Sequence, residues 1–280
     1  MSGKIRVVTD STASIPQSLL ETWGIEVVPL VLHVEEQEFH ENTDFGPEAL
    51  ISHLEAKQRI LTSQPTPKDF LQVYQRLTAQ GVSQIISIHL SGQLSGTVHA
   101  AAIAARECHI PVEVVDSRTV AMGLGFSVIK AATLSAQGAA FEEVLSASLQ
   151  TASKSRVIFA LDTLEFLRRG GRISPAAATL GTMLGLRPIL EVLDGKIEVS
   201  HRVRGENGAI TKLISLAQEQ LQIWPQAQVA IQYLNETPAV IRVREALRAA
   251  SGKPVLDCTV SSVVGAHCGP GVIGLVISTD

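Results

Sequence analysis

The stretch QIISIHLSGQLSGTVHAAAIAAREC, residues 84–108, contains the unit from which the fold can be deduced. Its β-branched start, Gln84–Ile88, predicts a buried strand, and the pattern from Thr97 to Cys108 predicts a helix. Between them lies a loop of glycines and hydroxyl side chains that leads from the carboxyl end of the strand into the first turn of the helix. Free N–H groups and the helix dipole favour an anion at such a place. This loop is the best candidate binding loop in the chain.

The same alternation of short strands and longer helices continues through the first half of the chain. Predicted strands lie at Ile5–Val8, Ile25–Leu32 and Val112–Val115, and predicted helices at Pro16–Trp23, Pro47–Glu55 and Lys68–Ala79. Strands that alternate with helices in this way are joined by crossover connections, which place them parallel to one another. We therefore expect an α/β domain with a mostly parallel sheet.

A second α/β domain is expected after the helical stretch Phe141–Lys154, where a new strand, Arg156–Leu161, begins. We place the boundary there, which gives an N-terminal domain of residues 1–153 and a C-terminal domain of residues 154–280. Further strands are predicted at Pro188–Val192, Ile197–Val199, Val229–Tyr233, Val255–Cys258 and Val272–Ile277, and helices at Ala209–Gln222 and Ala239–Ala250. A length of 280 residues suits two domains.

The composition argues against several classes of protein. A net charge of −4 gives no broad basic face for nucleic acid. No apolar run reaches the roughly 18 residues that cross a bilayer, so we expect no membrane insertion. The three cysteines, Cys108, Cys258 and Cys268, lack CxxC spacing and suit reduced thiols, so we expect a cytoplasmic location. Aliphatic side chains must fill the interior, which fits an ordinary core and an acyl-chain tunnel alike.

The loop Ser91–Thr97 does not carry a nucleotide-binding or hydrolase motif. The chain has no GxGxxG sequence, and none of its Gly-Lys pairs is preceded by the glycine of a Walker A loop, so we expect no site for ATP phosphates. Ser95 does not stand in a GxSxG elbow, because Gln93 occupies the first glycine position. Neutral hydroxyl and N–H donors for an anion remain the chemistry that this loop offers.

Three other segments each allow a functional and a structural interpretation. The hydroxyls and carboxylate of Thr9–Thr12 either bind a ligand or cap the next helix. Thr62 and Ser63 precede two prolines and are either fixed hydrogen-bond donors or part of a capped turn. His267, which is followed by Cys-Gly-Pro-Gly, either donates to a carboxylate, acts in proton transfer or is structural. Its spacing from the cysteines does not suit a zinc site.

A cationic stretch, Arg168–Arg172, is followed later in the chain by Arg202 and Arg204. Arginines near glycine turns pair with phosphate or with an acidic partner surface. Solvated charges and internal ion pairs account for the same residues equally well. The pattern alone leaves these alternatives open.

Seven segments taken together resemble, in order, the motifs of the DegV family of bacterial fatty-acid-binding proteins. They are Ile5–Ala13 (IRVVTDSTA), Thr62–Pro65 (TSQP), Leu94–Thr97 (LSGT), Val115–Ser117 (VDS), Asp162–Ser174 (DTLEFLRRGGRIS), Arg187–Leu190 (RPIL) and His267–Gly271 (HCGPG). Each motif is short, but seven in sequence over nearly the whole chain are specific.

The resemblance implies two α/β domains with one acyl chain in an internal apolar tunnel and its carboxylate near the domain junction. It implies a non-catalytic protein that presents the fatty acid to a separate ATP-binding subunit of a fatty acid kinase, with no cofactor besides the bound lipid. Thr62 and Ser95 would bind the carboxylate. The candidates close by are Ser63, Ser91, Gly92, Gly96 and His267, and the candidates that face the kinase are Arg172, Arg202 and Arg204.

Two other functions fit parts of the sequence. A stand-alone lipid carrier or sensor would need the tunnel and the binding loop Ser91–Thr97, here called the head-group loop, but no exposed arginines. An enzyme that acts alone would use Ser95 as nucleophile and His267 as base. We expect the kinase-coupled lipid-binding function, because a carboxylate held by neutral donors keeps an oxygen free to attack a phosphoryl group, while the chain carries no motif for ATP.

Overall fold

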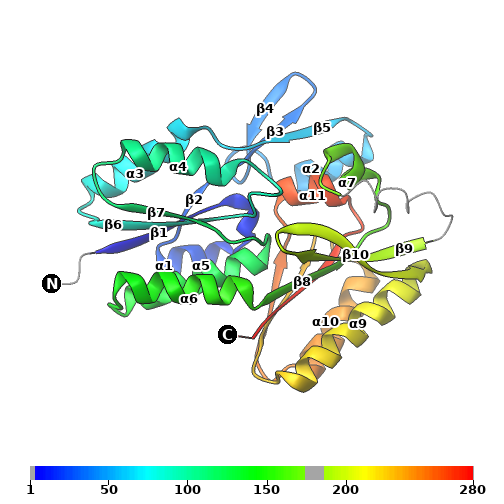
Figure 1. The fold of residues 1–280 in the computed structure, drawn as a ribbon. Coiled ribbons are helices and arrows are strands. Elements are labelled where there is room, and N and C mark those ends of the chain that lie inside the picture. Colours follow the sequence, from blue (N-terminus) through cyan, green and yellow to red (C-terminus); the bar gives the residue numbers. More distant parts are fainter. Residues whose placement is uncertain (1–3, 174–185, 280) are drawn as a thin grey trace.

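The computed structural model describes residues 4–173 and 186–279. The chain forms three sheets with helices packed around them (Figure 1). Ser174, the last residue of the motif Asp162–Ser174, lies outside the described residues.

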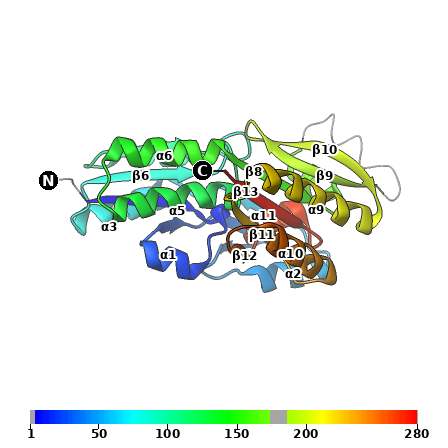
Figure 2. The same cartoon turned by 90° about the horizontal axis from the view of Figure 1, so that it is seen from below.

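The first sheet is parallel throughout and has the strand order β2-β1-β6-β7. Its strands are β1 (Ile5–Asp10), β2 (Glu26–Val28), β6 (Gln84–His89) and β7 (Val112–Asp116). Helices α3 (Pro67–Ala79) and α4 (Thr97–Glu107) cover one face, and α1 (Gln17–Trp23), α5 (Met122–Ala136) and α6 (Phe141–Ser153) cover the other (Figures 1 and 2). The predicted α/β class and parallel sheet are confirmed.

A small antiparallel sheet, ordered β4-β3-β5, follows β2 and was not predicted. It consists of β3 (Val31–Val34), β4 (Gln37–His40) and β5 (Ile60–Ser63), with α2 (Pro47–Glu55) between the last two. The prediction of one strand over Ile25–Leu32 is wrong. Pro29 has no N–H group to donate to a ladder, and the chain leaves the parallel sheet there before it enters the small one.

The third sheet is mixed and has the order β10-β9-β8-β13-β11-β12, in which β11 and β12 are parallel and the other pairs antiparallel. Its strands are β8 (Ser155–Ala160), β9 (Leu186–Leu193), β10 (Lys196–Arg204), β11 (Gln228–Tyr233), β12 (Val255–Thr259) and β13 (Ile273–Ser278). Helices α9 (Gly205–Ile223) and α10 (Pro238–Ala250) cover one face, while α7 (Glu165–Gly170) and α11 (Ser262–Cys268) lie on the other (Figure 1). A domain boundary after residue 153, between α6 and β8, remains our proposal.

Apolar side chains from both halves pack into one hydrophobic core at the junction between the sheets. This junction core includes Leu30, Leu32, Phe45, Leu50, Met122, Phe126, Phe159, Leu167, Leu190, Val260 and Val263. Because α5 also contacts β8 and β13 of the third sheet, the two halves share buried surface and do not merely touch. Within residues 4–173 and 186–279, no helix is long and apolar enough to cross a membrane.

Candidate functional site

An apolar cavity of about 60 Å³ lies at the junction, where the ends of β1, β5 and β6 meet α11. We call it the junction cavity. It is lined by Thr12, Leu30, Thr62, Ser63, Gln64, Leu90, Leu94, Ser95, Val120, Leu167, Arg172, Ile197, Val263, Val264, His267 and Cys268. Four of the predicted head-group residues are among them, together with Arg172, although they come from distant parts of the sequence. The cavity is therefore the candidate site.

A hydrogen bond of 2.8 Å joins the hydroxyl of Thr62, at the end of β5, to Nε2 of His267 on α11. Burial, and to a smaller extent the charge of Arg172, lower the pKa of His267 from 6.5 to about 4. The imidazole is thus neutral at neutral pH, and one of its nitrogens carries a proton that it can donate. The two side chains hold one proton each and their own hydrogen bond uses one of these, so the intact pair offers a carboxylate one neutral donor in an apolar setting.

Ser95 lines the same cavity, but its hydroxyl lies 2.9 Å from the hydroxyl of Thr97 and makes no described hydrogen bond to His267. A serine nucleophile needs a base within hydrogen-bond reach, and His267 instead pairs with Thr62. As described, Ser95 is a polar group of the cavity wall and not half of a nucleophile–base pair.

The loop residues Ser91, Gly92 and Gly96 do not line the junction cavity. The Ser91 hydroxyl is buried and donates to the carbonyl of Gly195, in the turn between β9 and β10, at 2.8 Å. The Gly92 N–H donates to both carboxylate oxygens of Asp116 at 3.2 Å. Gly96 leaves room for Gln64, because a Cβ there would lie 1.9 Å from the Gln64 Oε1. These groups hold the loop in place, and their contact with a ligand stays a prediction.

The segment Thr9–Thr12 acts mainly as a cap, which confirms the structural interpretation. Asp10 accepts hydrogen bonds from the N–H groups of Thr12 and Leu90 at 3.1 and 3.0 Å. The Thr9 hydroxyl donates to the carbonyl of Ile88. Only Thr12 of this segment lines the junction cavity.

A fully buried polar chain, which the sequence did not reveal, runs behind this cap. Asp10 bonds Nδ1 of His89 at 3.0 Å, Nε2 of His89 bonds Ser87 at 2.7 Å, and Ser87 bonds the hydroxyl of Tyr74 at 2.8 Å. The order Asp-His-Ser is that of a hydrolase triad. Because Ser87 has no exposed surface and already contacts Tyr74, it cannot meet a substrate. This row of hydrogen-bonded side chains stabilises the buried polar centre of the N-terminal half.

The arginines fall into three environments. Arg168 and Arg169 form ion pairs with Glu165 on the same helix, so internal ion pairs account for these two arginines. Arg172 is half-buried in the cavity wall and donates to the carbonyl of Leu94 at 3.1 Å. The exposed pair, Arg202 and Arg204 on β10, has no ion pair in the described part of the chain. Contact of these arginines with a partner protein stays a prediction.

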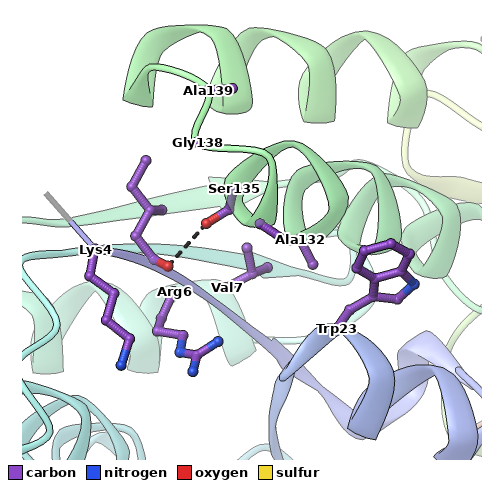
Figure 3. Close-up of a pocket in the computed structure, with 10 residues that line it drawn as sticks. Lys4, Arg6, Val7, Trp23, Ala132, Ser135, Gly138 and Ala139 are labelled. Carbon is purple, nitrogen blue, oxygen red and sulfur yellow. Dashed lines mark hydrogen bonds between the residues drawn. The ribbon is translucent and has the colours of Figure 1, made fainter. Parts of the chain in front are cut away.

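A larger cavity, of about 320 Å³, opens at the other end of the parallel sheet (Figure 3). Lys4, Arg6 and Trp23 line it, and Ser135 lies in its wall and donates to the carbonyl of Ile5. Ligands of open α/β sheets bind beyond the carboxyl ends of the strands, whereas this cavity lies at the amino end of β1. It contains none of the predicted site residues, so the smaller junction cavity is the better candidate.

Comparison with known proteins gives one consistent result. Residues 4–280 match the family model described as "Uncharacterised protein, DegV family". A DegV domain-containing protein of Streptomyces coelicolor is 36% identical over 281 residues, which is 100% of both chains. A solved structure of a DegV family protein from Thermus thermophilus, described by its fatty acid binding, has a TM-score of 0.92 at 32% identity over 99% of this chain and 100% of that one. DegV of Bacillus subtilis, described as a fatty acid binding protein, has a TM-score of 0.91 at 28% identity over 100% of both chains.

Proposed function

Because this chain belongs to the DegV family, we propose that it binds one long-chain fatty acid, with the carboxylate in the junction cavity and the acyl chain in the junction core. The observation that carries the proposal is the neutral Thr62–His267 pair in a mostly apolar cavity. The relatives from Thermus thermophilus and Bacillus subtilis, both described as fatty acid binding, support it.

The head-group chemistry follows from the cost of burying a carboxylate. A buried carboxylate needs hydrogen bonds to replace those it makes to water. Thr62, Ser95 and the neutral imidazole of His267 supply donors, and the guanidinium of Arg172 supplies positive charge in the same wall. Arg172 already donates to the backbone carbonyls of Leu94 and Gly170, so part of its hydrogen-bonding capacity is used while its charge still stabilises a carboxylate in the cavity.

The acyl chain needs more room than the junction cavity offers. A volume of about 60 Å³ suits a carboxyl group, so among the described residues a long chain finds room beside this cavity if side chains of the junction core move apart. Burial of a CH2 group gains about 0.8 kcal/mol, so about 14 of them gain on the order of 11 kcal/mol. That gain offsets the cost of separating side chains that now pack together, whose contacts the lipid replaces.

The lipid itself is the first test. We expect the purified protein to release about one equivalent of a long-chain fatty acid on organic extraction, and the delipidated protein to take one up again. Native mass spectrometry of the protein, followed by identification of the extract, measures this directly. A protein that is empty as purified and also fails to take up added C14–C18 fatty acids would refute the proposal.

We further propose that the bound carboxylate is presented to a separate ATP-dependent kinase, which implies a cytoplasmic location. The absence of Walker A and GxGxxG motifs from the sequence supports a need for a partner that brings the nucleotide. The exposed Arg202 and Arg204 are suited to an acidic partner surface. They lie on β10, whose turn at Gly195 contacts the head-group loop through Ser91.

An assay of acyl-phosphate formation separates a kinase subunit from a stand-alone carrier, and reversal of these two charges tests whether the kinase docks on β10. We expect the double variant Arg202→Glu/Arg204→Glu to lower the rate of acyl-phosphate formation with the cognate kinase about 10-fold or more, because like charges at an interface repel. Its fatty acid affinity should stay unchanged. Arg106→Glu, an exposed arginine on α4, is the matched control. Equal rates for the double variant and the control would show that the kinase does not dock on these arginines, whereas no acyl phosphate from the unsubstituted protein with any candidate kinase would favour the carrier.

A further inference from the structure

Glu41 is a buried carboxyl group that neither the motifs nor the head-group chemistry involve. It follows β4 and has only 1% of its surface exposed. Its backbone N–H donates to the carbonyl of Leu30 at 2.9 Å, and it forms an isolated bridge with Phe45. A carboxyl group is costly to bury, so its position calls for a specific set of partners.

Those partners come from the other half of the chain. One oxygen of Glu41, Oε1, accepts a hydrogen bond of 2.8 Å from the N–H of Val263, in the first turn of α11. The hydroxyls of Ser11 and Ser261 also favour its ionised form, whereas burial and the nearby Asp10 oppose it. Its second oxygen, Oε2, has no hydrogen-bond partner among the described residues. Within the described residues, the bond from Val263 is the hydrogen bond of defined length that the Glu41 side chain makes, and it ties Glu41 to α11.

Each segment that Glu41 connects also supplies a wall of the junction cavity. Ser11 precedes the lining residue Thr12, and the Ser11 hydroxyl accepts a hydrogen bond from the N–H of Leu30 at 2.9 Å. Leu30 itself lines the cavity. Helix α11 contributes more of the wall than any other helix described, through Val263, Val264, His267 and Cys268. Glu41 thus lies behind the cavity at the point where three of its walls meet.

The effect of this bond on α11 follows from the helix's length. Seven residues form fewer than two full turns, and a helix so short owes its place to tertiary contacts and not to its own stability. The Ser261 hydroxyl caps the N–H of Val264 at 3.2 Å, so Glu41 and Ser261 satisfy neighbouring N–H groups of the first turn. His267 lies one turn further along the same helix.

We propose that Glu41 is a positioning residue of the head-group site: it fixes the first turn of α11 and thereby holds His267 against Thr62. This inference deepens the proposed function and rests on it for its effect on lipid affinity. It does not require Glu41 to touch the lipid.

Three variants test the inference. Glu41→Ala removes the acceptor for the Val263 N–H, Glu41→Gln retains an oxygen in that place, and Glu38→Ala removes an exposed carboxylate from the same hairpin. We expect Glu41→Ala to weaken fatty acid binding about 10-fold, to speed amide exchange in α11 about 10-fold and to shift the imidazole nitrogen resonances of His267, since one lost hydrogen bond costs about 1–2 kcal/mol. Glu41→Gln and Glu38→Ala should remain within about threefold of the unsubstituted protein.

Two outcomes would overturn the inference. One is a Glu41→Ala protein that is less stable but keeps the α11 exchange rates and the His267 resonances. The other is a Glu41→Gln protein as impaired as Glu41→Ala. If Glu41→Ala does not fold, Glu41→Asp, in which the carboxylate is one methylene short of Val263, should show the same changes. The exchange and resonance measurements use lipid-free protein, so they decide the role of Glu41 even if the unsubstituted protein binds no fatty acid and the proposed function fails.

Discussion

Gly170→Ala should lower the affinity for a long-chain fatty acid by about 100-fold, although alanine is the better helix former. Gly170 is the last residue of α7, and a Cβ at this position would lie 2.1 Å from Nδ1 of His267. The imidazole must therefore shift or rotate, which disturbs its hydrogen bond to the Thr62 hydroxyl and the position of its free N–H group. Loss of a hydrogen bond to a charged ligand costs about 1.5–3 kcal/mol, or about 10- to 150-fold in affinity.

Titration calorimetry with a C16 or C18 fatty acid measures this effect, and Gly208→Ala provides the matched control. The Cβ of that variant would meet only Val203, at an ordinary 3.8 Å, near the start of α9. Thr62→Val removes the other half of the pair and should weaken binding too. Because both changes act through one imidazole, the double variant should lose less than the two single losses combined. Unchanged affinity in Gly170→Ala would mean that His267 does not contact the carboxylate.

Glu41 and His267 should give the free energy of unfolding opposite pH dependences, each of about 3 kcal/mol. Burial raises the pKa of Glu41 from 4.5 to about 7, so between these values the folded protein holds a proton that the unfolded chain has lost. Its contribution to stability is complete below pH 4.5 and is lost as the pH rises to 7. Burial lowers the pKa of His267 from 6.5 to about 4, so its contribution is complete above pH 6.5 and is lost as the pH falls to 4.

Between pH 4.5 and 6.5 one contribution falls as the other rises, so the stability of the unsubstituted protein changes little with pH, and single variants separate the two effects. Relative to that protein, Glu41→Gln should gain stability as the pH rises from 4.5 to 7, because the proton release that destabilises the fold is gone. His267→Gln should gain stability as the pH falls from 6.5 to 4. Urea unfolding at a series of pH values measures both differences, and Glu38→Ala, an exposed carboxylate, should follow the unsubstituted protein. Parallel curves for all four proteins would show that neither group is held away from its ordinary pKa.

Local sequence patterns predicted much of the fold, and the predictions that failed did so for physical reasons. The strand Gln84–Ile88 and the helix Thr97–Cys108 were confirmed within one residue, since the strand is a short β-branched run and the helix begins after Gly96 and ends ahead of Pro111. Helix α5 was missed, because nine of its residues are buried and it has no polar face to give a helical period. The division of Ile25–Leu32 between two sheets depends on Pro29 and on partners distant in sequence.

The site was predictable only in part. Thr62 and His267 are 205 residues apart, and their pairing follows from the packing of α11 on the small sheet, which no local pattern encodes. The resemblance to a family brought Thr62, Ser95 and His267 together as candidates, whereas the residues taken singly left structural alternatives open. Glu41 gave no signal, because it stands in a polar run between β4 and α2 whose other carboxylate, Asp44, is exposed. Its burial depends on the tertiary fold.

The junction core has a consequence for how long the molecule survives in a cell. Because the proposed lipid binds only the folded chain, the protein without lipid lacks the stabilisation that binding provides and opens more often. Proteases cleave the opened form, and a ligand that binds only the folded chain reduces that form in proportion to its free concentration. The amount of this protein would then rise and fall with the supply of fatty acid, so that its abundance reports lipid supply without any dedicated sensor.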